Sequence, residues 1–412
     1  MTRNSTIVIV GGGQAGFQAA VSLRERGFDG RVVMVAEEPA LPYQHPPLSK
    51  AYLMGKLDRA ALRFRPEAFF ADNGIELRSG LRVEKIDRDA RQVLLNGGEA
   101  IAYDHLILAL GARNRPLPVP GFNLDGVAQL RTVEDADILR EFLDKAGRVV
   151  VIGAGFIGLE FASAAAERGA EVTVLETADR PMARVLSKEM ADYFRVAHEA
   201  HGIRFKFGAA AARLLGEARV EAVETSDGQH FPADLVLVGI GVIPNTEIAA
   251  AAGLAVGNGI IVDEHLTTND PLISAIGDCA MHPNPYAVNG TIRLESVQGA
   301  VDQAYCVANC LTGHPISYGS LPWFWSEQGS LRLQIAGLTQ PHDQTVVRET
   351  EADGKGGLSV YCFRSGRLIG VESVNRPLDH ALARRLLVSG KEMPTPEEVA
   401  NPAFALKTWI TA

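Results

Sequence analysis

The hydrophobic residues of this chain form short continuous runs, and glycine follows several of them. Thr6–Val10 is a run of β-branched and apolar residues that ends at Gly-Gly-Gly-Gln-Ala-Gly, residues 11–16. The segment Phe17–Arg26 has helical character, and a second run, Arg31–Ala36, ends at two adjacent glutamates. Short apolar runs bounded by glycine are typical of buried strands, so this region predicts a strand, a glycine turn, a helix and a strand.

The same pattern occurs a second time. Val149–Ile152 leads into residues 153–158, which read Gly-Ala-Gly-Phe-Ile-Gly, and a helical segment, Leu159–Arg168, follows. Glu171–Leu175 predicts the next strand, and Glu176 ends it. The chain therefore contains two copies of one strand–turn–helix–strand unit, each with an acid at its end.

Both glycine turns match the G-x-G-x-x-G sequence of dinucleotide-binding proteins. In each copy the turn follows a predicted strand and opens a predicted helix, and an acid lies 26 residues after Gly11 and 23 residues after Gly153. The first glycine permits the turn, the second lets the backbone approach a pyrophosphate, and the third lets the helix pack on the strand. The helix N-terminus offers N–H groups to the phosphates, and the acid accepts hydrogen bonds from a ribose. Two copies in this context predict two dinucleotide sites.

The remaining apolar segments complete an α/β pattern. Leu106–Gly111 and Leu235–Gly241 predict strands that return to the two sheets, whereas Arg82–Ile86 and Gln92–Leu95 predict antiparallel inserts. Gly259–Ala280 predicts a third β-α-type region. After residue 322 the pattern changes to alternation, which predicts a separate small α+β domain. Its expected antiparallel strands and the helix after them are Arg332–Ile335, Thr345–Arg348, Leu358–Phe363, Arg367–Ser373 and Pro377–Leu387.

Composition and charge narrow the function class. The 412 residues include 40 basic and 49 acidic side chains, for a net charge of −9, which argues against a nucleic-acid-binding protein. No run of about 18 apolar residues is present, and a predicted core strand begins at Thr6, so we expect neither a membrane span nor a targeting segment. The four cysteines form no C-x-x-C pair and no metal-binding spacing, so we expect no metal site and a reducing, cytoplasmic location.

The sequence resembles the flavoproteins with two dinucleotide-binding domains and, within them, the NADH-dependent ferredoxin reductases of bacterial oxygenase systems. The resemblance covers nearly the whole chain. It rests on both glycine turns and on Pro46–Leu53, Leu130–Thr132, Gly241–Asn245, Ile276–Cys279, Leu294–Val297 and Trp323–Ser326. One departure is Ala109-Leu110-Gly111, where the wider family has Ala-Thr-Gly, but the glycine is retained. The resemblance implies two Rossmann-like domains and a C-terminal α+β domain. The implied boundaries are 1–112 and 247–322 for the FAD-binding domain, 113–246 for the NAD-binding domain and 323–412 for the C-terminal domain.

By this resemblance the first unit holds FAD. The implied contacts are Gly11, Gly13, Ala15 and Gly16 to the pyrophosphate, Glu37 to the adenosine ribose, Val83 and Arg131 at the adenine end, Asp278 at the ribityl chain and Val297 near the flavin ring. Glu38 is a near-equal alternative to Glu37, because the end of a strand is not fixed to one residue by sequence. Pro46 and Trp325 are implied to flank the flavin ring, and Trp323 is expected in the core.

The second unit is implied to hold NADH. The implied contacts are Gly153, Gly155, Ile157, Gly158, Glu176, Arg184, Gly241 and, at the nicotinamide amide, Glu295. The carboxylate of Glu176 suits a free 2′-hydroxyl and repels a 2′-phosphate, which favours NADH over NADPH. Arg180 and Arg184 follow closely and keep NADPH open as an alternative.

The resemblance also implies the chemistry. Lys50 and Glu160 are expected to form an ion pair beside the flavin, where the lysine stabilises negative charge and the glutamate helps to place the nicotinamide. Because no dithiol is available, electrons are expected to leave singly, to a 2Fe-2S ferredoxin that feeds a cytochrome-type monooxygenase or a ring-hydroxylating dioxygenase. The alternatives are a rubredoxin reductase, an NADH oxidase or peroxidase, and a redox-sensing interaction protein resembling apoptosis-inducing factor.

The expected partner is acidic, as ferredoxins generally are, so docking would need a basic face against the net charge of this chain. Arg63 and Arg65 are candidates for that face. Residues 364–391 are a second candidate, because they contain six basic side chains (Arg364, Arg367, Arg376, Arg384, Arg385, Lys391) and two acids.

Overall fold

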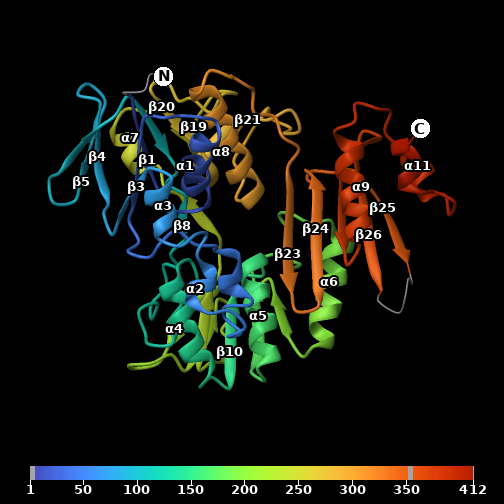
Figure 1. Ribbon diagram of the computed structural model, residues 1–412. Coiled ribbons are helices and arrows are strands. Elements are labelled where there is room, and N and C mark those ends of the chain that lie inside the picture. Colours follow the sequence, from blue (N-terminus) through green and yellow to red (C-terminus); the bar gives the residue numbers. More distant parts are fainter. Residues whose placement is uncertain (1–4, 351–355, 412) are drawn as a thin grey trace. The chain divides into compact units, whose positions relative to one another are not determined.

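The computed structural model describes residues 5–350 and 356–411, and its elements are labelled in Figure 1. The chain divides into two compact units. Unit 1 comprises Met1–Gln44, Ala60–Arg113 and Ile243–Pro322, and unit 2 comprises His45–Arg59, Asn114–Val242 and Trp323–Ala412. Two short strands, β8 (Ala112–Asn114) and β17 (Val242–Pro244), contain two of the boundaries, and helix α2 (Arg59–Leu62) contains a third.

Unit 1 is built on a five-stranded parallel sheet. Its strand order is β20 (Ile273–Ala275), β7 (His105–Leu108), β1 (Thr6–Val10), β2 (Arg31–Ala36) and β3 (Ile75–Ser79). In the central strand Val8 lies opposite Val33 on one side and Leu106 on the other. All three side chains are fully buried. Strands covered on both faces are apolar throughout, which explains why these runs do not alternate.

The helices and smaller strands of unit 1 surround this sheet. Helix α1 packs against α8. The helices are α1 (Gln14–Glu25), α3 (Ala68–Asp72), α7 (Glu247–Ala251) and α8 (Val297–Leu311), with one 3-10 turn, η2 (Gly277–Cys279). The insert β4 (Val83–Asp87), β5 (Gln92–Leu95) and β6 (Ala100–Ala102) is antiparallel, and β18 (Val256–Gly257), β19 (Gly259–Ile261), β21 (Ala280–Pro283) and β22 (Thr291–Ile292) form a further sheet.

Unit 2 repeats this plan and adds a second layer. Its parallel sheet has the order β12 (Arg204–Phe207), β11 (Glu171–Glu176), β10 (Arg148–Ile152), β16 (Leu235–Val238) and β9 (Val127–Ala128). The helices are α4 (Val133–Leu143), α5 (Phe156–Glu167) and α6 (Lys188–Ala200), with one 3-10 turn, η1 (Pro46–Ser49). The insert β13 (Ala211–Leu215), β14 (Ala222–Thr225) and β15 (His230–Pro232) is antiparallel, as in unit 1.

The C-terminal part of unit 2 is an antiparallel sheet. Its order is β23 (Trp323–Gln328), β24 (Leu331–Gly337), β27 (Arg367–Val374), β26 (Gly357–Arg364) and β25 (Gln344–Thr350). The helices of this part are α9 (Pro377–Leu387), α10 (Pro396–Ala400) and α11 (Leu406–Thr411). Strand β23 packs on α5 and β26 on α6, whereas α9 packs on β24 and β27. The C-terminal sheet is thereby joined to the helices that follow the second glycine turn.

The predicted α/β fold with a C-terminal α+β part is confirmed, and the differences are local. Helix α1 begins at Gln14, inside the glycine turn rather than after it, because the turn itself supplies the first helical N–H groups. The region Gly259–Ala280 was predicted as β-α-type, which is wrong: it holds short strands and one 3-10 turn, and the helix comes later as α8. Within the described residues, no helix combines the length and the apolar character that crossing a membrane requires.

Candidate functional site

The first glycine turn combines two tight contacts with one open position. Gly11 has φ +122°, and a Cβ placed there would lie 2.1 Å from the carbonyl oxygen of Ala109. A Cβ on Gly16 would lie 2.0 Å from the carbonyl oxygen of Gly11, whereas a Cβ on Gly13 would meet nothing within 4 Å. The outer glycines are therefore required by the protein's own packing, and the middle one leaves space. In this motif the middle glycine is the position where the protein backbone approaches the pyrophosphate of the ligand.

The start of helix α1 fits a phosphate-bearing ligand. Gly13 is its N-cap and has no side chain, so no side-chain hydrogen bond caps the helix. The first N–H groups of a helix lack partners within the helix, and together with the helix dipole they favour an anion. A Cβ on Gly277 would lie 2.9 Å from the Cβ of Ala15, so the turn that carries Asp278 packs directly on this part of α1. The glycine turn and Asp278 thus lie together, as predicted for FAD.

The structure separates the two candidate acids at the end of β2. The strand ends at Ala36, and Glu37 follows it with an exposed side chain. Glu38 accepts a 2.5 Å hydrogen bond from the hydroxyl of Tyr43, so its carboxylate already has a partner in the protein. The N–H of Leu81 donates to the carbonyl of Ala36, which brings the start of β4, with Val83, near the same strand end. Glu37 is the better candidate for a ribose contact.

Two residues that the sequence did not single out support the Asp278 turn. The amide oxygen of Gln303, fully buried on α8, accepts a 2.7 Å hydrogen bond from the N–H of Gly277. Arg293 donates to the carbonyl of Asp278 (3.1 Å) and forms a 2.8 Å ion pair with Glu295. Arg293 therefore joins two predicted cofactor residues, and Val297 begins the helix that follows. The position of this arginine between two predicted site segments, Ile276–Cys279 and Leu294–Val297, is the signal that the sequence offered.

The second glycine turn has the same geometry and a more constrained acid. A Cβ on Gly153 would lie 2.4 Å from the carbonyl oxygen of Gly239, one on Gly158 would lie 2.2 Å from that of Gly153, and one on Gly155 would meet nothing within 4 Å. Glu176 is the last residue of β11, and its carboxylate accepts hydrogen bonds from the N–H groups of Ala154 (2.7 Å) and Ala178 (2.9 Å). These bonds hold the acid against the turn.

The two arginines after Glu176 differ in their surroundings. Arg180 forms an ion pair with its neighbour Asp179 at 2.9 Å. Arg184 is exposed, and its guanidinium lies beside Gly241, 3.5 Å from where a Cβ would stand. The structure thus brings together two residues predicted to contact the nicotinamide dinucleotide. Ile157, also predicted for this site, lies in the first turn of α5 and is 42% exposed.

Lys50 and Glu160 form the expected ion pair, in unit 2. The Nζ of Lys50 lies 2.6 Å from Oε2 of Glu160 and donates a second hydrogen bond, 3.1 Å, to the carbonyl of Pro46. Glu160 is only 6% exposed and lies two residues after Gly158, on the helix that begins at the second glycine turn. The pair therefore has a fixed position relative to that turn.

Two serines complete this group, which we call the Glu160 cluster (Ser49, Lys50, Glu160, Ser326). The hydroxyl of Ser49 donates to Oε2 of Glu160 at 2.5 Å, and that of Ser326 donates to Oε1 at 2.6 Å. Ser49 belongs to η1, and Ser326 belongs to β23 of the C-terminal sheet. Sequence reasoning missed both serines. The alternation of Phe324, Ser326 and Gln328 along one strand is the signal that could have found Ser326.

The prediction for Trp323 is wrong. Trp323 and Trp325 are only partly buried, and their rings stack 5.5 Å apart on one face of β23, because residues i and i+2 of a strand share a face. The guanidinium of Arg384, on α9, lies 4.3 Å from the centre of the Trp323 ring. Trp323 is therefore part of a cation–π stack rather than of the core. Trp325, predicted to flank the flavin, is the ring at the other end of this stack from Arg384.

The predicted FAD contacts are divided between the units. Gly11, Gly13, Ala15, Gly16, Glu37, Val83, Asp278 and Val297 belong to unit 1, and Pro46, Lys50, Arg131 and Trp325 belong to unit 2. Arg131 precedes the N-cap of α4 and lies near His45, since its positive charge adds to the desolvation that lowers the pKa of that histidine.

Three of the four cysteines are buried, unreactive thiols. Cys279 is fully buried, and desolvation raises the pKa of its thiol to about 11, while desolvation raises that of Cys306 to about 12. Burial likewise raises the pKa of Cys362. The thiolate is the nucleophilic form, so such thiols are inert. Among the described residues, no group of three or more histidine, cysteine or acidic side chains is arranged to hold a metal ion.

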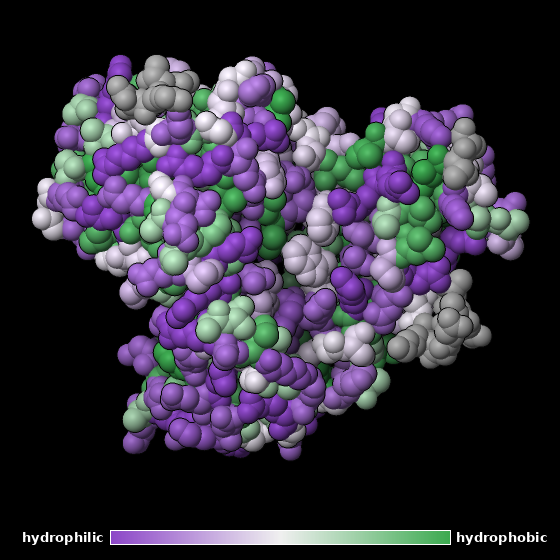
Figure 2. Space-filling model, viewed as in Figure 1, coloured by the Kyte–Doolittle hydropathy of each residue, from purple (hydrophilic) through white to green (hydrophobic). Residues whose placement is uncertain are grey.

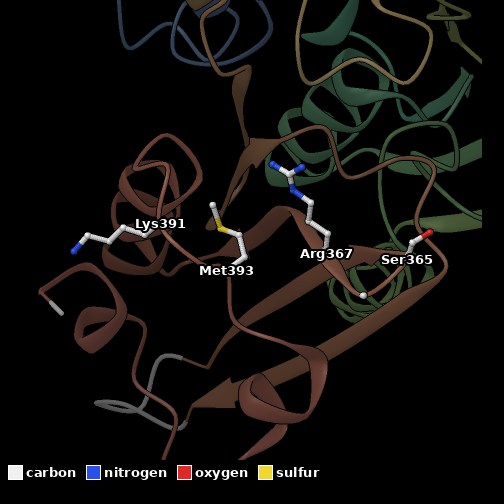
Figure 3. Close-up of a pocket in the computed structure, with 5 residues that line it drawn as sticks. Ser365, Arg367, Lys391 and Met393 are labelled. Atoms are coloured by element: carbon white, nitrogen blue, oxygen red, sulfur yellow. The ribbon is translucent and has the colours of Figure 1, made fainter.

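The predicted basic region of the C-terminal part is a mixed surface. Of its six basic residues, Arg376 forms an ion pair with Asp379 at 3.0 Å, and Arg384 lies on Trp323. Figure 2 shows hydrophobic surface around α9 and β25, where Leu378 is 67% and Val347 40% exposed. Figure 3 shows a surface pocket lined by Ser365, Gly366, Arg367, Lys391 and Met393, from which the side chains of Arg367 and Lys391 extend in different directions.

Comparison with known proteins agrees with this geometry. The family described as pyridine nucleotide-disulphide oxidoreductase matches residues 5–304, and the reductase C-terminal family matches residues 323–410. Rhodocoxin reductase of Rhodococcus erythropolis is 53% identical over 407 residues, which cover 98% of this chain and 94% of that protein. A crystal structure of the ferredoxin reductase for the CYP199A2 system from Rhodopseudomonas palustris is 51% identical, with a TM-score of 0.94 and coverage of 98% and 99%. The covalent putidaredoxin reductase–putidaredoxin complex is 38% identical, with a TM-score of 0.94 and coverage of 99% and 98%.

Proposed function

The chain belongs to the pyridine nucleotide-disulphide oxidoreductase family, and from this we propose that it carries electrons from NADH to a 2Fe-2S ferredoxin. It is an FAD-dependent oxidoreductase that uses a nicotinamide dinucleotide. We assign a ferredoxin as the electron acceptor by similarity to the relatives, since one of the matching structures is a reductase in covalent complex with putidaredoxin. The ferredoxin in turn supplies a cytochrome-type monooxygenase or a ring-hydroxylating dioxygenase.

The observation that carries the proposal is the largely buried Lys50–Glu160 ion pair on the helix of the second glycine turn. Disulphide reductases need a dithiol beside the flavin, and this sequence has no C-x-x-C pair. The Lys50 ammonium is a fixed positive charge 2.6 Å from a carboxylate that is itself held by two serines. A charge pair of this kind can stabilise developing negative charge without rearranging.

Within this proposal, each group has a separate role. FAD, when bound, would supply a flavin able to take a hydride and to give up single electrons. Glu37, Gly13 and Asp278 hold its ribose, pyrophosphate and ribityl chain, and Val83, Arg131 and Val297 contribute further contacts. Glu176, Gly155 and Arg184 hold the nicotinamide dinucleotide, with Glu295 at its amide. Lys50 and Glu160 orient and polarise the reacting end, and Pro46 and Trp325 exclude water from it.

The test of this role is Lys50→Met, with Lys56→Met as its matched control. Lys56 lies in the same segment and also pairs with a glutamate of α5, but its side chain is 62% exposed, and exposed pairs contribute little. We expect Lys50→Met to slow anaerobic flavin reduction by NADH about a hundredfold, the range of one lost electrostatic contact in a closed site. Lys56→Met should reduce at the wild-type rate. Equal rates for both variants would remove the assignment.

Docking on the C-terminal basic face is a separate part of the proposal. If an acidic ferredoxin binds there, turnover with ferredoxin falls steeply as salt rises, because exposed charges are screened beyond roughly 8–10 Å at physiological ionic strength. Arg385→Glu, on α9, should raise the KM for ferredoxin. Arg204→Glu is the control: it makes the same charge change at an exposed residue of β12, elsewhere in unit 2, and should leave this KM unchanged. Arg63→Glu and Arg65→Glu test the candidates of unit 1. Salt-independent turnover would overturn the basic face.

The alternatives predict different acceptors and cofactors. A rubredoxin reductase would turn over rubredoxin faster than any ferredoxin, and an NADH oxidase would consume oxygen without a protein acceptor. A redox sensor resembling apoptosis-inducing factor would change its association state with NADH but reduce cytochrome c slowly, even with ferredoxin present. NADPH replaces NADH as a control in each assay.

The cytoplasmic location is also part of the proposal. It rests on the four free cysteines and on the need for NADH as electron donor. Fractionation of the source cells, followed by detection of the protein in the fraction that contains NADH, tests it.

A further inference from the structure

The Glu160 cluster continues into the C-terminal sheet through Gln328. Gln328 lies two residues after Ser326 on β23, so the two side chains share a face of the strand, and it is 1% exposed. Its Nε2 donates to the hydroxyl of Ser326 at 3.2 Å and to the sulfur of Met182 at 3.6 Å. Its Oε1 lies 2.7 Å from Nε2 of His198. A buried amide with both ends occupied is held in one orientation.

His198 extends the network to helix α6. It is 3% exposed, and desolvation lowers the pKa of its imidazole, which keeps the ring neutral near neutral pH. Gln328 Oε1 can only accept, so Nε2 of His198 carries the proton. The other ring nitrogen, Nδ1, then accepts, and the hydroxyl of Ser163 on α5 lies 3.5 Å from it.

The donors of this network all point the same way. Ser163 donates to His198, His198 to Gln328, Gln328 to Ser326, and Ser326 to Oε1 of Glu160. We call these five residues the hydrogen-bond chain. It ends on a carboxylate, which only accepts when ionised, and each bond polarises the next.

We propose that Gln328 is a positioning residue for hydride transfer, which fixes the carboxylate of Glu160 through Ser326 and joins it to the segment that follows Glu176. This inference rests on the proposed function. It gives the C-terminal sheet a part in the reduction of the flavin, in addition to any part in docking.

The contact with Met182 supplies the link to the dinucleotide side. Met182 is 5% exposed with φ +51°, a conformation that a residue with a side chain adopts rarely, and its N–H donates to the carbonyl of Ala154 in the second glycine turn at 2.9 Å. Arg184 lies two residues further on, beside Gly241. Gln328 therefore touches both the support of Glu160 and the segment that leads to Arg184.

Two variants break the hydrogen-bond chain without changing much volume. Gln328→Met removes the amide, and Ser326→Ala removes the last donor to Glu160. Ser359→Ala is the matched control: Ser359 is also fully buried on a strand of the same sheet, and its hydroxyl also donates to a carboxylate, that of Asp379 at 2.8 Å. All three variants are compared at equal FAD content.

We expect Gln328→Met and Ser326→Ala to lower the limiting rate of anaerobic flavin reduction by NADH about tenfold, the lower end of the range for supporting hydrogen-bond partners of a site. We also expect the pH profile of that rate to shift for both, because the hydrogen bonds that fix the carboxylate of Glu160 are lost. Ser359→Ala should change neither. Since no ferredoxin is present, failure of the ferredoxin assignment leaves this result intact. Wild-type rates and an unshifted profile in both variants would overturn the inference.

A second measurement reports on the wild-type holoenzyme and uses a variant only to assign the signal. NMR of protein with 15N-labelled histidine rings, with His198 identified by its loss in His198→Asn, reports which ring nitrogen carries the proton. The hydrogen-bond chain requires the Nε2–H form at neutral pH. The Nδ1–H form would reverse the chain at Gln328 and overturn the inference.

Discussion

The two glycine turns have the same backbone but hold their acids differently. In both, the outer glycines pack against a carbonyl at 2.0 to 2.4 Å from a would-be Cβ, and the middle glycine faces open space. Glu176 accepts two backbone hydrogen bonds, one of them from the turn itself, whereas Glu37 is exposed at the end of β2. The acid of unit 2 is therefore held in place by the protein itself, whereas the side chain of the acid in unit 1 is exposed.

This difference fits the two kinds of ligand. A group that stays bound can order its own contacts once, during assembly. A dinucleotide that arrives and leaves in each cycle binds with less ordering cost when the acid is already in place. In unit 2 the segment after Glu176 is also held by side chains of the C-terminal sheet, such as Gln328, which contacts Met182. The two units thus share the glycine turn and differ in the side chains that surround it.

Substitution of the two middle glycines, Gly13 and Gly155, should produce the largest change, and the two variants should lose different cofactors. Gly13→Ala and Gly155→Ala add a methyl group into open space, so we expect both proteins to fold. Gly13→Ala should be isolated without FAD and without activity, because the methyl group stands where the pyrophosphate would approach. Gly155→Ala should keep FAD and lose reduction by NADH. Flavin absorbance and anaerobic reduction measure the two outcomes, and FAD loss from both variants would contradict the division of cofactors between the turns.

The second prediction concerns a position where the two parallel sheets differ. His105 and Leu235 are the first residues of corresponding strands, opposite Ile7 and Val149. His105 is 3% exposed, and desolvation lowers its pKa to about 4. Because the folded pKa lies below the usual value near 6.5, the stability this neutral histidine contributes is present above pH 6.5 and is lost as the pH falls toward 4. The loss amounts to as much as about 3 kcal/mol.

His105→Leu places the residue of unit 2 in unit 1 and removes this titration. It leaves the hydroxyl of Ser274, 2.9 Å from the ring, without its partner, which costs about 1 kcal/mol at every pH. We therefore expect a lower free energy of unfolding at pH 7.5 but a flatter decline toward pH 4.5, measured by denaturant titration. His201→Gln, at an exposed position, is the control. An unchanged slope for His105→Leu would show that His105 does not titrate on unfolding.

The third prediction tests the two acids directly. Glu176→Ala removes an acceptor from the N–H of Ala154, so we expect a loss of about 1 kcal/mol in stability as well as a relaxed preference for NADH over NADPH. Glu37→Ala should weaken FAD binding without lowering the stability of the protein before FAD is added. Thermal unfolding and the ratio of kcat/KM for the two nucleotides report these effects. Equal loss of stability in both variants would remove the contrast between the acids.

Much of the architecture could be predicted because each glycine turn is a local feature. Gly11, Gly16 and their counterparts depend on neighbours within one strand–turn–helix unit, and the sequence contains all of these neighbours. The ion pair of Lys50 with Glu160 joins residues 110 apart, so only resemblance to a family could indicate it. Alternation along β23 could have placed Ser326 and Gln328 on one face, but it could not give their partners, which depend on how a distant sheet packs on α5. The expected burial of Trp323 failed because its ring lies in a stack with Trp325 and the guanidinium of Arg384, a contact that depends on a distant helix.

The last prediction concerns Glu372, a residue of the C-terminal sheet that binds the start of helix α6. Its carboxylate is fully buried on β27 and accepts hydrogen bonds from the N–H (2.9 Å) and hydroxyl (2.5 Å) of Ser187, the N-cap of α6. Burial raises its pKa, so the stability linked to its protonated form is present below the usual carboxyl range and is lost as the pH rises through the raised pKa.

Glu372→Gln removes this charge and keeps one oxygen to accept from the Ser187 N–H. We expect the free energy of unfolding of the variant to vary less with pH above pH 5, with a difference of about 1 kcal/mol from wild type by pH 8. Ser187 lies three residues after Arg184. If the Glu372–Ser187 contact only holds the fold, the KM for NADH should change less than twofold, which is at the lower limit of what one hydrogen bond contributes. Denaturant titration at pH 5 and pH 8 gives the first quantity, and a variant that keeps the wild-type pH slope would show that Glu372 is ionised in the folded protein.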